Sequence, residues 1–142
     1  MRLWHKDLIP VLPRQQLLSQ WRECCCIARN IEVNGTPNHL LVNKLLDYPE
    51  AQFNVYALAV HNEMKRRGYK CDWNGFTKWR VNRCYEWELK DIFSEWHNDR
   101  YFTQCWYNLQ EKYDCGGITE EEWWKVTELW RKKILCTPTI QP

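Results

Sequence analysis

The 142-residue chain lacks several features that would assign it quickly to a class of protein. It has no apolar run of the roughly 18 residues that a membrane span needs, so no membrane helix is predicted. Its formal charge is only +2, so any attraction to nucleic acid must come from local clusters of cations. The opening letters, MRLWHKD, have neither the apolar core nor the cleavage site of a secretory signal, and we expect a cytoplasmic, non-secreted protein.

Cysteine pairs at metal-binding spacing are also missing, although the chain has 8 cysteines. Cys24, Cys25 and Cys26 are contiguous, and the others are scattered without a CxxC pair. This spacing argues against a zinc site, and a reducing cytosol favours free and mostly buried thiols. We expect no metal and no organic cofactor. The contiguous cysteines leave one alternative open, a cysteine-dependent interaction or redox protein.

No segment alternates convincingly between apolar and polar residues, so strands are not predicted and the fold class is all-α. The length fits a single compact domain, residues 1–136, followed by a loose tail, residues 137–142. Four helices are expected, with a long loop or short irregular helices between the second and the third. They cover residues 14–30, a stretch from near 47–53 to Gly68, a stretch from 97 to the stop at Gly116, and a stretch from the capping box at Thr119 to about 134.

Aromatic residues are abundant, with 10 tryptophans that must fill a core, stack on ligands, or do both. On the first two helices, apolar residues recur at helical spacing and predict the faces that pack inward. The first face comprises Leu17, Leu18, Trp21, Cys25 and Ala28, and the second comprises Phe53, Tyr56, Ala57, Val60 and Met64.

The chain terminus is unusually apolar and aromatic. Terminal residues are ordinarily ones that can stay in water at no cost, and Trp4 is not such a residue. We therefore expect the first turn to dock against the body of the protein. Docking would make the α-amine of Met1 a positioned group, and α-amines, with an ordinary pKa of about 7.7 to 8.0, can act as nucleophiles near neutral pH.

Charged residues next to this amine and on the first helix could join it. Arg2, Arg14, Arg22 and Glu23 could share its polar side, and Arg22 and Glu23 diverge by about 100° because they are adjacent on a helix. One could face a phosphate and the other a sugar. An amine can form a Schiff base with a sugar carbon while a nearby carboxylate moves protons, which is glycosylase and lyase chemistry. The same residues also occur as solvated charges on ordinary helices.

Two stretches, MRLWHKDLIPVLPRQQLLSQWRECC and NHLLVNKLLDY with HNEMKRRGYKCD, resemble the pyrimidine-dimer DNA glycosylase family of the phage endonuclease V type. The likeness is sharpest over residues 1–26 and fair over residues 39–72. It implies a compact all-α fold in which the N-terminal segment threads between helices, in a phage or bacterial protein. It also implies excision of one base of a cyclobutane pyrimidine dimer, followed by β-elimination at the abasic site.

The resemblance also implies roles for individual residues. The family's catalytic glutamate falls on Glu23, and its phosphate-contacting arginines fall on Arg22 and Arg2. The terminal amine falls on Met1, because bulky Arg2 should prevent removal of the methionine. Arg14 and Arg29 are further expected DNA contacts. The chain departs from the family at two positions, since Gln16 stands where the family has a histidine and Cys26 where it has an arginine.

A second basic stretch, TKWRVNRCYEW, interleaves cations with aromatic rings, a mixture that can track a phosphate backbone and stack on bases. Its expected DNA contacts are Lys78, Arg80 and Arg83. The same aromatic loop could instead cover the core.

Together these observations predict a monomeric DNA glycosylase with abasic (AP) lyase activity. Its partner would be double-stranded DNA carrying a damaged or modified base, with the cyclobutane pyrimidine dimer as the expected lesion. Two alternatives stay open beside the cysteine-dependent protein. One is a glycosylase for another lesion or modified base, and the other is a DNA-binding module on the same scaffold without chemistry.

Overall fold

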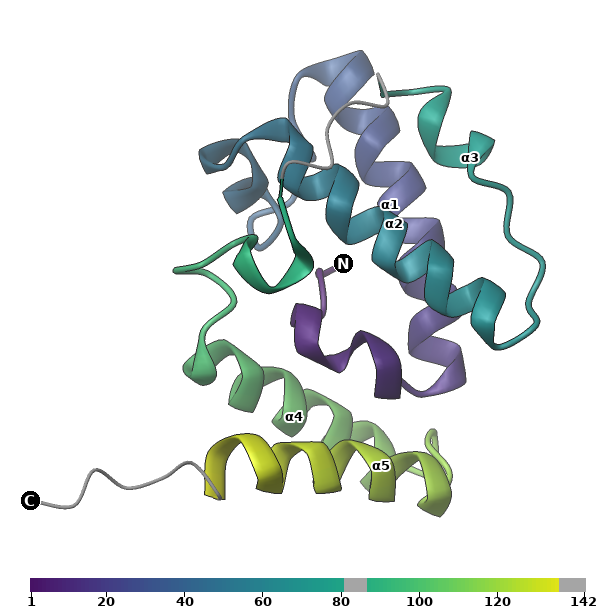
Figure 1. The fold of residues 1–142 in the computed structure, drawn as a ribbon, viewed down its shortest axis with the longest axis vertical. Coiled ribbons are helices and arrows are strands. Elements are labelled where there is room, and N and C mark those ends of the chain that lie inside the picture. Colours follow the sequence, from purple (N-terminus) through teal and green to yellow (C-terminus); the bar gives the residue numbers. More distant parts are fainter. Residues whose placement is uncertain (81–86, 136–142) are drawn as a thin grey trace, which may run out of the picture.

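The computed structural model describes residues 1–80 and 87–135, and every regular element in these ranges is helical, which confirms the all-α prediction. Figure 1 shows the arrangement. The longer helices are α1 (Arg14–Asn34), α2 (Glu50–Arg66), α4 (Asp99–Asp114) and α5 (Glu120–Trp130). The short elements are η1 (Lys6–Val11), η2 (Asn43–Asp47), α3 (Asn74–Thr77), η3 (Leu89–Asp91) and the π-helical turn η4 (Arg131–Leu135).

The helices begin and end at residues whose chemistry explains the boundary. α1 continues four residues beyond the predicted end and stops at Gly35, whose φ of 75° is a left-handed conformation that glycine adopts without strain. At the start of α5 the predicted capping box is present, because Thr119 and Glu122 each accept a hydrogen bond from the other's backbone N–H. The predicted tail, residues 137–142, lies outside the described residues, and the division at residue 136 stays a prediction.

The core stripe predicted for α2 is confirmed, since Phe53, Tyr56, Ala57, Val60 and Met64 are all buried. The stripe predicted for α1 is confirmed only in part, at Leu17 and Ala28. Its buried face contains Leu17, Gln20, Cys24, Ile27 and Ala28, whereas Leu18, Trp21 and Cys25 are only half-buried. The helix is rotated because polar Gln20 faces inward, where the N-terminal segment supplies partners for its amide.

That segment runs between two pairs of helices, as predicted. In Figure 1 the N-terminus and η1 lie between α1 and α2 on one side and α4 and α5 on the other. Leu3, Trp4, Leu8 and Ile9 are at most 6% exposed, so the apolar side chains of this segment form part of the core. These side chains are buried between the two pairs of helices, and their burial fixes the terminus. The apolar character of the terminal sequence predicts this docking.

Glu122 connects α5 to the start of α1. Its Oε2 accepts a 2.7 Å hydrogen bond from the backbone N–H of Arg14, one of the N-terminal amides that α1 cannot satisfy itself. Aromatic pairs such as Trp106 with Trp130, whose ring centroids lie 4.5 Å apart, join α4 to the end of α5.

Among residues 1–80 and 87–135, no helix combines the length and the apolar character needed to cross a bilayer.

Candidate active site at the chain terminus

Side chains from α1 hold the backbone of the terminal segment. The backbone N–H of Arg2 donates to Glu23 Oε2 at 3.4 Å, and the carbonyl of Arg2 accepts from Gln20 Nε2 at 3.0 Å. The N–H of Trp4 donates to Gln20 Oε1 at 2.8 Å. Gln20 Nε2 also lies 3.4 Å from Glu23 Oε2. A single buried amide therefore fixes both the terminal segment and the carboxylate beside it.

Two tyrosines hold the same segment from the other helices. The hydroxyl of Tyr56 on α2 donates to the carbonyl of Trp4 at 2.6 Å and lies 2.9 Å from Gln20 Oε1. The hydroxyl of Tyr101 on α4 donates to the carbonyl of Leu3 at 2.6 Å. Burial raises the pKa of both phenols, so they stay protonated and act as donors. Three helices thus converge on three consecutive residues, Arg2 to Trp4.

Two neutral histidines, His5 and His97, pack against each other directly after the segment. His5 Nε2 donates to the carbonyl of His97 at 2.9 Å, and the N–H of Lys6 donates to His97 Nδ1 at 3.0 Å. His5 Nδ1 accepts from the N–H of Asp7 at 3.1 Å. Burial lowers the pKa of His5 to about 4 and the pKa of His97 well below its ordinary value. Both rings are therefore uncharged at neutral pH, each in the tautomer that these hydrogen bonds require.

The amine of Met1 lies at the exposed end of this framework. Met1 is 42% exposed, and its nitrogen is one residue from the N–H of Arg2 that contacts Glu23. One residue of chain spans at most about 3.6 Å, so the amine lies within about 7 Å of Glu23 Oε2. A substrate atom could therefore contact both groups at once.

Three of the predicted arginines lie on the terminal segment or on α1, the two elements that also carry Met1 and Glu23. Arg2 extends over the ring of Trp4, with 5.3 Å between its Cζ and the ring centroid. Arg22 and Arg29 are exposed on nearly the same face of α1, because seven residues bring a helix back to within about 20° of its starting direction. About 10 Å of helix separates them, and Arg22 also donates to Ser19 Oγ at 3.3 Å.

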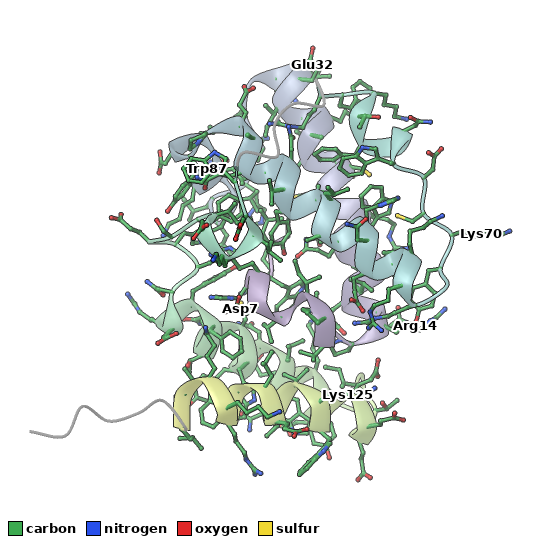
Figure 2. All side chains as sticks on the ribbon, in the orientation of Figure 1. Asp7, Arg14, Glu32, Lys70, Trp87 and Lys125 are labelled. Atoms are coloured by element: carbon green, nitrogen blue, oxygen red, sulfur yellow. The ribbon has the colours of Figure 1, made fainter. Side chains whose placement is uncertain are left out.

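Arg14 does not lie near the Met1 amine and Glu23. It begins α1, nine residues or about 13 Å of helix before Glu23, and its guanidinium lies 5.7 Å from the ring of Tyr69. Figure 2 labels Arg14 and Glu32 near the two ends of α1. Arg14 therefore lies beside the N-terminus of α5, away from the terminal amine.

In the second basic stretch, TKWRVNRCYEW, the described cations differ in role: one anchors the loop and one is exposed. Arg80 is an anchor: its Nε donates to Asn54 Oδ1 at 2.7 Å and its Nη2 to the carbonyl of Glu50 at 3.1 Å. Burial lowers its pKa, and these contacts tie the loop to α2. Lys78 is exposed beside the ring of Trp79. The predicted contact Arg83 lies outside the described residues.

The thiols of the described residues are free, but they are less uniformly buried than expected, since Cys26 and Cys115 are exposed. Burial raises the pKa of Cys25 and Cys71 to about 11. A thiol needs a lowered pKa to react readily, so these two lack the character of redox cysteines. No cluster of metal-ligating side chains occurs in the part of the chain that the structure describes.

A groove of about 530 Å³ opens beside the terminus. We call it the terminal groove; its lining comprises Arg2, Leu40, Leu41, Lys44, Glu95, Trp96, Asn98, Arg100, Tyr101 and Gln104. It contains three cations and one carboxylate, so it is electropositive. One wall comes from the turn before η2 and the other from the first turns of α4.

Sequence reasoning missed the residues that hold the terminus. Gln20 and Lys6 are polar residues that the fold buries, and their polar sequence neighbours gave no signal of that burial. Lys6 Nζ donates to the carbonyls of Lys90 and Ile92 at 2.7 and 2.6 Å. Tyr56 was predicted as part of the core stripe of the second helix, where it lies, but nothing in the sequence indicates that its hydroxyl, or that of Tyr101, reaches the terminal backbone.

Comparison with known proteins places this geometry in a family. A family model described as pyrimidine dimer DNA glycosylase matches residues 1–74, which include the terminal segment, Gln20, Glu23 and Tyr56. No curated protein and no solved structure matches the chain. The match spans slightly more than half of the sequence and agrees with the resemblance carried by the first 26 residues. The chain therefore belongs to the pyrimidine dimer DNA glycosylase family.

Proposed function

We propose that the chain is a DNA glycosylase with AP lyase activity in which the α-amine of Met1 is the nucleophile and Glu23 is the acid–base group. The single observation that carries this proposal is the hydrogen bond between the N–H of Arg2 and Glu23 Oε2, which brings the terminus and the carboxylate together. The family's substrate class is DNA, and a cyclobutane pyrimidine dimer is the lesion we assign.

The reaction begins with a nucleotide extruded from the duplex so that its C1′ can reach the amine. The free amine attacks C1′ and the bond from C1′ to the damaged base breaks, so the base leaves as an anion that takes a proton from solvent. Glu23 takes a proton from the attached amine and passes it to the ring oxygen, the bond from C1′ to that oxygen breaks, and a cationic imine forms. Glu23 is then again a carboxylate and stabilises the cation. A buried framework that already holds Arg2 to Trp4 reduces the entropy lost in positioning the nucleophile.

The second step is β-elimination. The imine acidifies the C2′ proton, Glu23 assists its removal, and the C3′–O bond breaks so that the 3′ phosphate leaves. Arg2 and Arg22 hold phosphates on the two sides of the sugar, and Arg29 extends this contact along α1. No step uses a metal or an organic cofactor.

The test is borohydride trapping on a duplex that carries one abasic site. We expect a stable adduct on the α-amine of Met1, identified by mass spectrometry of the crosslinked peptide. Glu23→Gln should abolish strand cleavage while DNA binding persists. Glu32→Gln, a carboxylate nine residues further along α1, is the matched control and should cleave normally.

A chain extended by one residue before Met1 should lose the adduct, because its amine would be displaced from Glu23. If the wild-type protein binds the duplex but gives no adduct at any pH between about 6 and 9, the imine mechanism is wrong. The chain would then be a DNA-binding member of its family without lyase chemistry.

A further inference from the structure

Two adjacent leucines are exposed at the edge of the terminal groove. Leu40 is 86% exposed and Leu41 is 51% exposed, whereas Val42 and Leu45, the next apolar residues, are at most 5% exposed. Single exposed leucines are ordinary on protein surfaces. An adjacent pair pointing outward from a turn that is anchored by buried neighbours forms a small apolar projection.

The turn that carries the leucines is held in one conformation. The carbonyl of His39 accepts hydrogen bonds from the N–H groups of Val42 and Asn43 at 3.0 and 2.8 Å. Asn43 Oδ1 in turn accepts from the N–H of His39 at 3.1 Å and from Thr36 Oγ1 at 3.3 Å. Little further conformational entropy is lost when such a turn binds, so it can present apolar side chains to a partner at low cost.

The surroundings indicate the chemistry of that partner. Lys44 lies beside the leucines, and Arg2 and Arg100 line the same groove, with Glu95 as its carboxylate. In Figure 1 the turn before η2 and the start of α4 lie on the same side of the molecule, to the left of the N-terminus. An apolar tip flanked by cations matches the DNA duplex, which presents stacked bases between rows of phosphates.

We propose that Leu40 and Leu41 insert into the base stack at the lesion, while Lys44 and Arg100 bind the phosphates on either side. This inference rests on the proposed function, because it takes DNA as the ligand of this face. Extruding a nucleotide leaves a gap and costs unstacking energy. Apolar side chains placed in the gap would offset that cost and keep the DNA kinked toward Met1.

The test uses a duplex with a tetrahydrofuran abasic analogue, which cannot form an imine, and 2-aminopurine as the neighbouring base. Wild-type protein should unstack the 2-aminopurine and raise its fluorescence. A Leu40→Ala, Leu41→Ala double variant should lose at least about half of that rise and bind the duplex roughly tenfold more weakly. Leu46→Ala is the matched control, because Leu46 is 52% exposed nearby and is not part of the groove lining.

A second measurement separates this inference from the chemistry. Borohydride trapping on a single-stranded abasic oligonucleotide needs no insertion into a stack, so the double variant should trap it as well as the wild type does. The inference is overturned if wild-type protein leaves 2-aminopurine stacked, if the double variant and Leu46→Ala behave alike, or if the double variant also loses single-strand trapping. If trapping fails for every protein but the fluorescence rise still depends on the leucines, the insertion stands and the proposed lyase chemistry falls.

Discussion

Lowering the pH from 7 to 5 should weaken the fold, because the native structure holds two histidines neutral beneath the terminal segment. Burial is the main cause of the lowered pKa of His5; Lys133 and Lys6 lower it further, whereas Asp7 and the hydrogen bond to His97 raise it. His97 is held neutral by burial and by its neighbours His5 and Lys6. Protonating either ring would place a charge in the core.

The sign and the size follow from proton linkage. Above a pH of about 6.5 the histidines are neutral in both the folded and the unfolded chain, so this stability is fully present. Below a pH of about 6.5 the unfolded chain binds protons that the folded chain does not. The free energy of unfolding therefore decreases as the pH is lowered. For His5, whose pKa drops from 6.5 to about 4, the full loss is about 3 kcal/mol, spread between these two values. His97 acts in the same direction, so the slope reaches about 2.7 kcal/mol per pH unit.

Urea denaturation followed by circular dichroism between pH 7 and pH 5 measures this slope at constant ionic strength. This range lies above the region where carboxylates protonate, so it isolates the histidines. His97→Asn keeps an acceptor near the Nδ1 position that binds Lys6 and should reduce the slope by about half. Equal unfolding free energies at pH 7 and pH 5, or an unchanged slope in His97→Asn, would refute the reasoning.

Other substitutions test the framework and the DNA contacts. Gln20→Ala should lower the free energy of unfolding by about 2 to 3 kcal/mol in urea titrations and reduce imine trapping, because it leaves terminal backbone groups buried without partners. Arg22→Ala should reduce the salt dependence of DNA binding by about one phosphate contact, measured by fluorescence anisotropy at several salt concentrations, with little effect on stability. Arg80→Ala should do the opposite, destabilising the fold by about 2 kcal/mol and leaving the salt slope unchanged. Glu122→Ala should cost about 1 to 2 kcal/mol in thermal unfolding, since it removes caps from α1 and α5.

The helices that the sequence predicted well are those whose patterns are local. The stripe of α2 has a period near 3.6, and the capping box at Thr119 needs only neighbours within one turn. The orientation of α1 was not predictable in this way. Its buried face includes Gln20, and a buried amide is stable only when distant backbone groups satisfy it, here those of Arg2 and Trp4.

The same distinction applies to the candidate site. The letters themselves carry Met1, Arg2, Arg22 and Glu23 within one short stretch, and the apolar terminus already predicts docking. They do not separate Arg80, which is an anchor, from Arg22, which is exposed, because each is an arginine that directly follows a tryptophan. The contacts that decide between these roles involve residues on α2, far away in the chain.

By itself, the sequence determined the all-α class, the docked terminus and the family, because these depend on composition, local periodicity and a contiguous motif. Only the tertiary structure decided how the terminus is held, since the hydroxyls of Tyr56 and Tyr101 reach it from helices 52 and 98 residues away. It alone also placed Leu40 and Arg100 along the same groove. Such pairings depend on how the helices pack, and packing is a property of the whole chain rather than of any window along it.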